Sequence, residues 1–232
     1  VLAPDGELLG ETNYENFIAN GDPNFAWTLP ENEWDAISLN YTSGTTGNPK
    51  GVVYHHRGAY MNAIGDILAW NMLQGPIYLW TLPMFHCNGW CFPWAIAAVN
   101  GTNICLRNVN ATSIYNAIKS YRVDHLCGAP IVLSMIVNAE EAERQEFNHT
   151  VKVMTAGAPP PVSTIKSIES IGFHITHAYG LTETYGPATV CAWHDNWNKE
   201  PIAEQARLKS RQGVQYPVLE SLSVRDSKTM KR

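Results

Sequence analysis

The sequence has 232 residues, of which 45% are hydrophobic and 16% charged, a composition typical of a globular chain of one domain or slightly more. The formal net charge of −5 and the lack of a basic run give no support to binding of nucleic acid or anionic membranes. No stretch reaches the roughly 20 apolar residues of a membrane span, so we expect none.

Strand-like and helix-like patterns alternate along the chain. Alternation or short apolar runs predict strands at 37–41, 77–82, 102–106, 123–127, 151–155 and 173–177. Helical spacing predicts helices over 60–68, after an Asn110 cap, over 130–139, and from Pro161 to a stop at Gly172. Residues 195–211 are polar and predict a surface excursion, whereas 213–224 resume strand-like alternation. The pattern indicates an α/β fold with mainly parallel strands, whose ligands bind at the carboxyl ends of the strands.

The segment 42–51, TSGTTGNPKG, follows the first predicted strand. Its glycines allow close backbone approach to an anion, its hydroxyls can donate hydrogen bonds, and Lys50 supplies positive charge for a polyphosphate. It is not a Walker A loop, because Pro49 precedes the lysine. A flexible surface loop is the alternative, but the density of these residue types after a strand favours a phosphate site.

Together with three later motifs, this loop resembles that of the adenylate-forming superfamily, which includes acyl-CoA synthetases, luciferases and peptide-synthetase adenylation domains. The segment 83–90, PMFHCNGW, resembles the family's acyl-pocket motif, 155–159, TAGAP, its adenine-contacting turn, and 179–184, YGLTET, its Tyr-Gly-x-Thr-Glu signature. The resemblance implies the large N-terminal-domain core of the adenylate-forming fold, in incomplete form, with mainly parallel sheets flanked by helices. It also implies ATP and Mg²⁺ as cofactors and coenzyme A as co-substrate.

The resemblance assigns roles to individual residues. Tyr179 would stack on adenine, Thr182 would donate to the α-phosphate, and Glu183 would hold Mg²⁺. The residues implied in catalysis are Lys50, His86, Thr182 and Glu183. Those implied in binding the nucleotide are Thr42, Ser43, Gly44, Thr45, Thr46, Gly47, Lys50, Gly157, Ala158, His177, Ala178, Tyr179, Gly180 and Thr182.

Some residues have alternative interpretations. Without the resemblance, His86 in its aromatic stretch would be read as a core residue; with it, His86 should border the carboxylate and the adenylate. Trp90, Phe92 and Trp94 could be pocket walls or core. A zinc site at His86, Cys87 and Cys91 lacks a second Cys/His pair, and the five cysteines fit buried thiols in a reducing compartment better than disulfides.

The family's ribose-binding Asp and its mobile C-terminal domain, with an essential Lys, have no match in this sequence. We therefore expect residues 1–232 to be the central part of an AMP-binding domain, with the mobile domain absent, and we expect the fragment alone to be inactive. The main hypothesis is an acyl-CoA ligase. The alternatives are an adenylation domain that loads a carrier protein and a truncated, non-catalytic nucleotide-binding protein.

Flanking segments such as HLCGAPIVLSMIVNA resemble plant acyl-activating enzymes of the peroxisomal short- and medium-chain, benzoate or cinnamate type. The implied partners are a small-molecule carboxylic acid, ATP and coenzyme A, and the expected location is intracellular, peroxisomal or cytosolic. The acid itself cannot be read from the sequence.

Overall fold

The computed structural model describes residues 10–42 and 47–232. The chain divides into two units, Val1–Asn32 and Glu33–Arg232. In the first unit, α1 (Tyr14–Ala19) begins after Asn13, whose side chain accepts a hydrogen bond from the Asn16 amide at 2.8 Å. This is an N-cap, which satisfies one of the free amides at the start of the helix.

The described part of the second unit contains a seven-stranded sheet with the strand order β4-β3-β5-β6-β7-β8-β9. Its strands are β3 (Ile77–Trp80), β4 (Thr102–Cys105), β5 (His125–Gly128), β6 (Val151–Thr155), β7 (Phe173–Leu181), β8 (Gly186–Val190) and β9 (Val214–Gln215). The first five strands in this order pair in parallel, and β8 and β9 join antiparallel. The predicted α/β fold with mainly parallel strands is confirmed.

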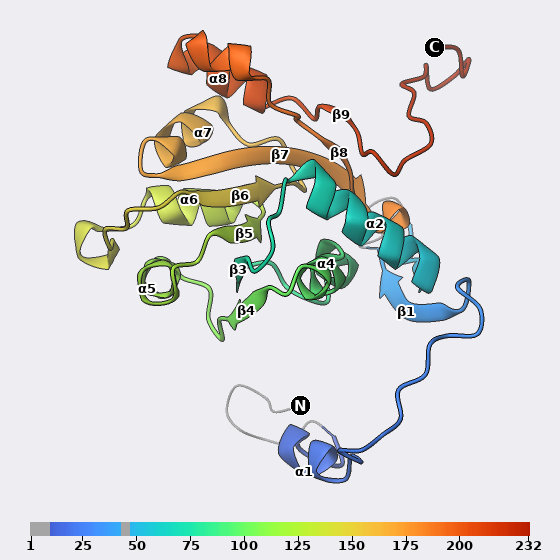
Figure 1. Ribbon diagram of the computed structural model, residues 1–232. Helices are drawn as coiled ribbons and strands as arrows, with labels where there is room; N and C mark the ends of the chain where they lie inside the picture. Colours follow the sequence, from blue (N-terminus) through green and yellow to red (C-terminus); the bar gives the residue numbers. More distant parts are fainter. Residues whose placement is uncertain (1–9, 43–46) are drawn as a thin grey trace. The chain divides into compact units, whose positions relative to one another are not determined.

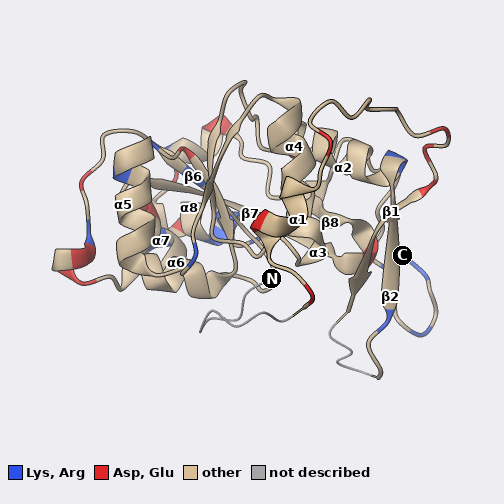
Figure 2. Cartoon of the chain, turned by 90° about the horizontal axis from the view of Figure 1, so that it is seen from below, with Lys and Arg blue, Asp and Glu red and all other residues tan. Residues whose placement is uncertain are grey.

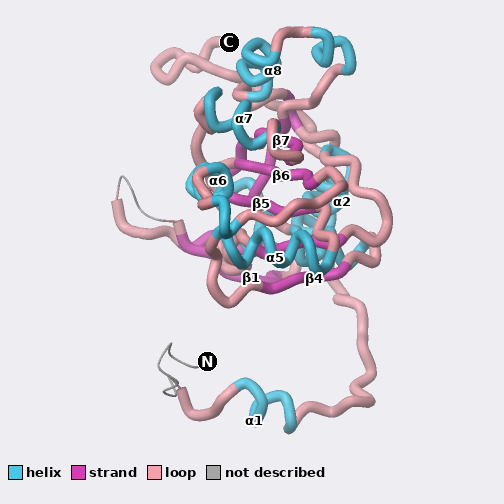
Figure 3. The backbone as a smooth tube through the Cα atoms, turned by 90° about the vertical axis from the view of Figure 1, so that its left-hand side faces the viewer, coloured by secondary structure: helices cyan, strands magenta, loops and turns pink. Residues whose placement is uncertain are grey.

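Helices cover both faces of this sheet (Figures 1 and 3). They are α2 (His56–Ala69), α3 (Cys87–Trp90), α4 (Phe92–Ala98), α5 (Ala111–Tyr121), α6 (Pro130–Val137), α7 (Val162–Glu169) and α8 (Ile202–Lys209), with 3-10 turns η1 (Glu141–Glu143), η2 (Thr182–Thr184) and η3 (Asp195–Lys199). Alternate strand residues face opposite sides: Leu79 packs in a core with α5, α6 and α7, whereas Tyr78 and Trp80 pack in a second core with α4 and part of α2. Apolar strands buried on both faces account for the runs seen in the sequence.

Several local signals act as predicted. Asn110 caps α5, its side chain accepting from the Ser113 amide at 2.8 Å. Gly172 follows α7 with φ +95°, a conformation that glycine adopts without steric cost.

Three predictions need correction. Tyr60 and Leu68, expected on the apolar face of the first helix, are exposed, and α2 instead buries Ala59, Asn62 and Asp66 among others. The predicted strand over 213–224 shrinks to β9, and the polar stretch 195–211 contains α8, which buries Ala206 and Leu208. The spacing of residues within a segment does not determine these outcomes. They depend on contacts with parts of the chain that are distant in sequence.

A separate two-stranded hairpin lies at the start of the second unit. β1 (Ala36–Tyr41) pairs antiparallel with β2 (Gly51–His55), so Tyr41 is opposite Gly51, and the described residues of the glycine-rich segment, 42 and 47–50, lie between the two strands in the sequence. The sequence predicted β1 but not β2, because the loop residues obscure where the second strand begins.

Lysines and arginines are spread over several elements of the second unit and interspersed with acidic residues (Figure 2). In the described part of the chain, no helix combines the length and the apolarity needed to cross a membrane.

Candidate active site

A cavity of about 270 Å³ brings three of the sequence motifs together. Its walls are formed by His86, Cys87, Trp90, Ala156, Gly157, Gly180, Leu181, Thr182, Gly186 and Pro187. These residues follow the carboxyl ends of β3 and β6 or lie at the end of β7 and the start of β8. The cavity therefore occupies the edge of the sheet at which α/β folds bind ligands.

The first wall comes from the PMFHCNGW segment. After His86 the backbone enters the left-handed region at five consecutive residues, Cys87 to Cys91, with φ between 42° and 66°. Residues other than glycine disfavour this region, so contacts with other segments of the chain must stabilise the conformation. Asn88 provides one anchor, because its side-chain oxygen accepts from Ser38 Oγ at 2.6 Å and from Asn40 Nδ2 at 2.8 Å.

The second wall is the turn after β6. Gly157 has φ +88° and open space where a Cβ would lie. Its backbone conformation, not crowding, requires glycine here.

The third wall is the end of β7, which continues through Tyr179 and Gly180 to Leu181, where the sequence predicted a loop. A Cβ on Gly180 would lie 1.7 Å from the Gly186 carbonyl oxygen. Glycine at this position lets β7 and β8 approach closely beside the cavity, which gives a packing reason for the glycine of the signature.

The η2 turn places Thr182 at the cavity. Within the turn, the Thr184 hydroxyl accepts from the Leu181 amide at 2.9 Å and contacts the Gly186 carbonyl oxygen at 2.8 Å. Thr184 therefore fixes the turn internally, while Thr182 remains half-buried and lines the cavity.

Cys87 and Thr182 meet in the cavity wall, with 3.3 Å between the thiol sulfur and the hydroxyl oxygen. Burial raises the pKa of the Cys87 thiol, so it stays protonated near neutral pH. A protonated thiol can donate to the Thr182 oxygen, which leaves the Thr182 proton free to donate into the cavity.

The ends of the phosphate-loop candidate close the hairpin. The Thr42 amide donates to the Lys50 carbonyl oxygen at 3.0 Å, and the Lys50 amide donates to Thr42 Oγ1 at 3.1 Å. Gly47 and the Lys50 side chain are exposed, and Ser43, Gly44, Thr45 and Thr46 lie outside the described residues.

Other predicted site residues do not line the cavity. Ala158 and Glu183 are exposed and Tyr179 is 36% exposed, whereas Ala178 is buried in the core beside α4. His177 is buried, and its Nδ1 lies 2.9 Å from the Ser210 carbonyl oxygen and 3.0 Å from that of Arg211. Nδ1 therefore donates to α8's end, and burial lowers the pKa of this imidazole.

The aromatic residues left open by the sequence now separate. Trp90 lines the cavity, Phe92 is fully buried in the core, and Trp94 packs against that core. Sequence reasoning missed Cys87, Ala156, Leu181, Gly186 and Pro187 as lining residues. The only sequence signal for these residues is that they lie within or next to the recognised motifs.

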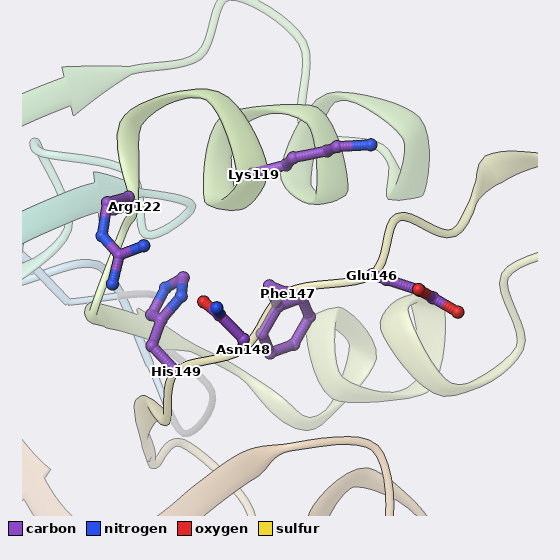
Figure 4. Close-up of a pocket in the computed structure, with 6 residues that line it drawn as sticks. All are labelled: Lys119, Arg122, Glu146, Phe147, Asn148 and His149. Atoms are coloured by element: carbon purple, nitrogen blue, oxygen red, sulfur yellow. The ribbon is translucent and has the colours of Figure 1, made fainter.

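A second hollow, of about 380 Å³, lies near the amino-terminal ends of β5 and β6, and Figure 4 shows the residues that line it. Its lining residues are Lys119, Arg122, Glu146, Phe147, Asn148 and His149, which precede β5 and β6. No predicted site residue belongs to it.

The described residues contain neither a disulfide bond nor a cluster of side chains suited to zinc. All five cysteines are free and four are buried as predicted, whereas Cys105, which was also expected to be buried, is exposed. Within residues 10–42 and 47–232, no group of three or more His, Cys, Asp or Glu side chains could hold a metal ion.

Comparison with known proteins identifies the class. The family model described as AMP-binding enzyme matches residues 5–232, so the chain belongs to the AMP-binding enzyme family. The sequence is 55% identical over 223 residues to the peroxisomal acetate/butyrate–CoA ligase of Arabidopsis thaliana, covering 96% of this chain and 39% of that protein. It is 49% identical over 224 residues to the peroxisomal trans-cinnamate:CoA ligase of Petunia hybrida, covering 95% and 39%. The chain thus spans about two fifths of the length of these curated relatives.

Solved structures agree on the fold. The N-terminal domain of FACL13 from Mycobacterium tuberculosis superposes with a TM-score of 0.66 at 29% identity, covering 74% of this chain and 44% of that one. The ATP-bound RpMatB–BxBclM chimera has a TM-score of 0.75 at 21% identity, covering 99% and 42%.

Proposed function

We propose that the protein containing this chain activates a carboxylic acid with ATP to an acyl-adenylate and then transfers the acyl group to coenzyme A. One observation supports this most: His86, Gly157, Gly180 and Thr182, from three motifs far apart in the sequence, line a single cavity at the carboxyl end of the parallel sheet.

The nucleotide would lie between that cavity and the hairpin loop. Thr182 would donate its hydroxyl to the α-phosphate, and Lys50 with the hydroxyls of 42–46 would bind the outer phosphates. The ring of Tyr179, a residue that is 36% exposed, would stack on adenine, and Gly157 and Ala158 would form the edge of the purine slot. His177 and Ala178 would support this strand end from beneath.

Magnesium would enter with ATP. Glu183 is an exposed carboxylate on the same turn as Thr182, which fits a cation held by one carboxylate plus substrate phosphates. The bound cation would neutralise phosphate charge as pyrophosphate leaves.

The reaction would run in two displacements. A carboxylate oxygen, bordered by His86, attacks the α-phosphorus, and pyrophosphate departs with the electron pair of the broken bond. Thr182 and Lys50 would reduce the repulsion between the substrate carboxylate and the ATP phosphates, and would stabilise the negative charge that develops on the phosphate oxygens. The thiolate of coenzyme A then attacks the acyl carbonyl, and AMP leaves.

The substrate class follows the relatives. Those matched at about half identity are named as ligases of acetate, butyrate, 2-methylpropanoate or trans-cinnamate with CoA, which favours a small organic acid and CoA over a carrier protein. Some are named peroxisomal, and we infer a peroxisomal or cytosolic location for this protein.

Residues 1–232 would be the central part of the AMP-binding domain. The complete enzyme would also need the ribose-binding Asp and the mobile domain with its Lys, which have no counterpart in this sequence.

The test uses the longest reading frame that contains this sequence. The purified protein is incubated with ATP, Mg²⁺, CoA and each of acetate, butyrate and cinnamate, and the products are separated by mass. We expect AMP and an acyl-CoA thioester that depend on the acid. Formation of ADP, or of AMP without any thioester, would contradict the proposal.

A further inference from the structure

The hairpin that ends in the phosphate loop is joined to the η2 turn through β2. Tyr54, near the end of β2, is fully buried, although its neighbour Val53 is 57% exposed. Its hydroxyl donates to the Thr182 main-chain carbonyl oxygen at 2.8 Å. This bond links two segments that are 128 positions apart in the sequence.

A second tyrosine closes the same junction from the other side. The rings of Tyr54 and Tyr185 are stacked, with centroids 4.1 Å apart and an angle of 25° between their planes. The Tyr185 hydroxyl accepts from the His55 amide at 3.0 Å, and the Tyr185 carbonyl oxygen accepts from Asn62 Nδ2 at 3.0 Å. The η2 turn is therefore fixed to β2 at its beginning and to both β2 and α2 at its end.

We propose that Tyr54 is a positioning residue, which holds Thr182 in register with the phosphate-loop hairpin so that both parts of the nucleotide site act on the same phosphates. The inference rests on the proposed function. Tyr54 does not line the cavity and acts through the Thr182 backbone.

The chemistry makes this register important. Thr182 would contact the α-phosphate, whereas the hairpin loop would contact the phosphates that leave as pyrophosphate. The two groups must keep a fixed spacing while the bond between those phosphates breaks, and a shift of about 1 Å in such a contact can cost about 100-fold in rate. A tyrosine ring held by stacking and one hydrogen bond supplies a rigid spacer.

A double-mutant cycle tests the proposal in the longest reading frame that contains this sequence. Tyr54→Phe removes the hydroxyl and keeps the ring, and Thr182→Val removes the side-chain donor and keeps the shape. The rate of acyl-AMP formation is measured for wild type, both single variants and the double variant. Each rate is divided by the concentration of sites that bind a stable acyl-adenylate analogue. Counting sites removes any loss that arises only from misfolded protein.

A matched control is available on the other face of the sheet. Tyr115 is also buried, and its hydroxyl donates to a main-chain carbonyl, that of Ile136, at 3.2 Å. Tyr115→Phe removes the same kind of bond without touching η2 or the hairpin. We expect its rate per site to equal that of wild type.

We expect Tyr54→Phe to lower kcat/KM for ATP about 10-fold in the wild-type background and less than about 2-fold in the Thr182→Val background, because its effect passes through Thr182. Equal losses in both backgrounds, or no loss in Tyr54→Phe, would overturn the inference alone. A wild-type protein that forms no acyl-AMP with any acid would overturn the proposed function and the inference with it.

Discussion

The Cys87 thiol sulfur lies 3.3 Å from the Thr182 hydroxyl oxygen, in the wall of the cavity at the end of the parallel sheet. The two residues are 95 positions apart in the sequence. Their contact joins the segment that would border the acid to the segment that would contact the α-phosphate. A protonated thiol at this distance can donate a hydrogen bond to the Thr182 hydroxyl oxygen.

Replacing Cys87 tests that hydrogen bond. Cys87→Ala removes the donor and should lower kcat/KM for ATP about 2- to 10-fold, the worth of one hydrogen bond of roughly 0.5–1.5 kcal/mol. Cys87→Ser keeps a donor and should retain most of the activity. Cys105→Ala, at an exposed cysteine, is the control. An alanine variant as active as wild type, combined with an impaired serine variant, would argue against donation by the thiol.

Gly180→Ala tests the close approach of β7 and β8. The added methyl group would meet the Gly186 carbonyl oxygen at 1.7 Å, so the strands must separate beside Thr182. We expect the free energy of unfolding to fall by about 1–3 kcal/mol or more. We also expect the rate of acyl-AMP formation to fall by more than this loss of stability explains. Denaturant titration and acyl-AMP formation measure the two effects. Gly10→Ala, which meets open space, should change neither; a Gly180→Ala protein that resembled it would refute the packing argument.

Much of the architecture could be predicted because its signals are local. The Asn110 cap and the apolar strands each depend on a few neighbouring residues. The loops that carry Gly157 and Thr182 could be placed together in advance because parallel strands bring their carboxyl ends to one edge, whereas His86 was expected at the site from the family resemblance.

What could not be predicted depends on partners distant in sequence. The apolar spacing of α2 indicated Tyr60 and Leu68 as buried, yet the helix buries Asp66, whose side-chain oxygen Oδ1 accepts a hydrogen bond from the Tyr216 hydroxyl, 150 positions away. Tyr54 has no recognisable signal either, since its hydroxyl binds a main-chain carbonyl, which every residue has.

Trp90→Ala tests whether this ring limits the size of the acid. Trp90 is 5% exposed and forms part of a cavity of about 270 Å³, so its removal should enlarge the space for the acyl chain. Because one methylene in an apolar pocket is worth about 1–3 kcal/mol, kcat/KM should shift toward longer acids by about 10-fold or more per added methylene. A series from acetate to hexanoate measures the profile. Trp94→Ala is the control because Trp94 packs against the core outside the cavity lining. An identical chain-length profile in the Trp90 variant would rule out this role.

Asp66→Asn tests the charge state of the buried carboxyl. Asp66 is fully buried with Oδ2 unpartnered, and burial raises its pKa well above the ordinary value, against a smaller opposite effect of the Tyr216 hydroxyl. The folded state therefore keeps a proton that the unfolded state releases above pH 3.8. Stability must then fall as the pH rises from that value to the folded-state pKa, by up to about 1.4 kcal/mol per pH unit.

The isosteric Asn has no proton to lose, so its Tm relative to wild type should increase between pH 5 and pH 8. Differential scanning calorimetry at both values gives the comparison, and groups common to the two proteins cancel in the difference. A Tm difference that is the same at both values would show that Asp66 is not held protonated.

The most direct test of the account is acid-dependent exchange of radiolabelled pyrophosphate into ATP, measured without CoA. The enzyme is the purified protein encoded by the longest reading frame that contains this sequence. The exchange requires reversible formation of an acyl-adenylate, the step assigned to the cavity lined by His86 and Thr182. We expect exchange that needs the acid and that falls about 10- to 100-fold in Thr182→Val, the range for loss of a hydrogen bond of roughly 1.5–3 kcal/mol to a charged group. Exchange that proceeds equally without acid, or that is undiminished in Thr182→Val, would contradict the assignment of this cavity as the site of acyl-adenylate formation.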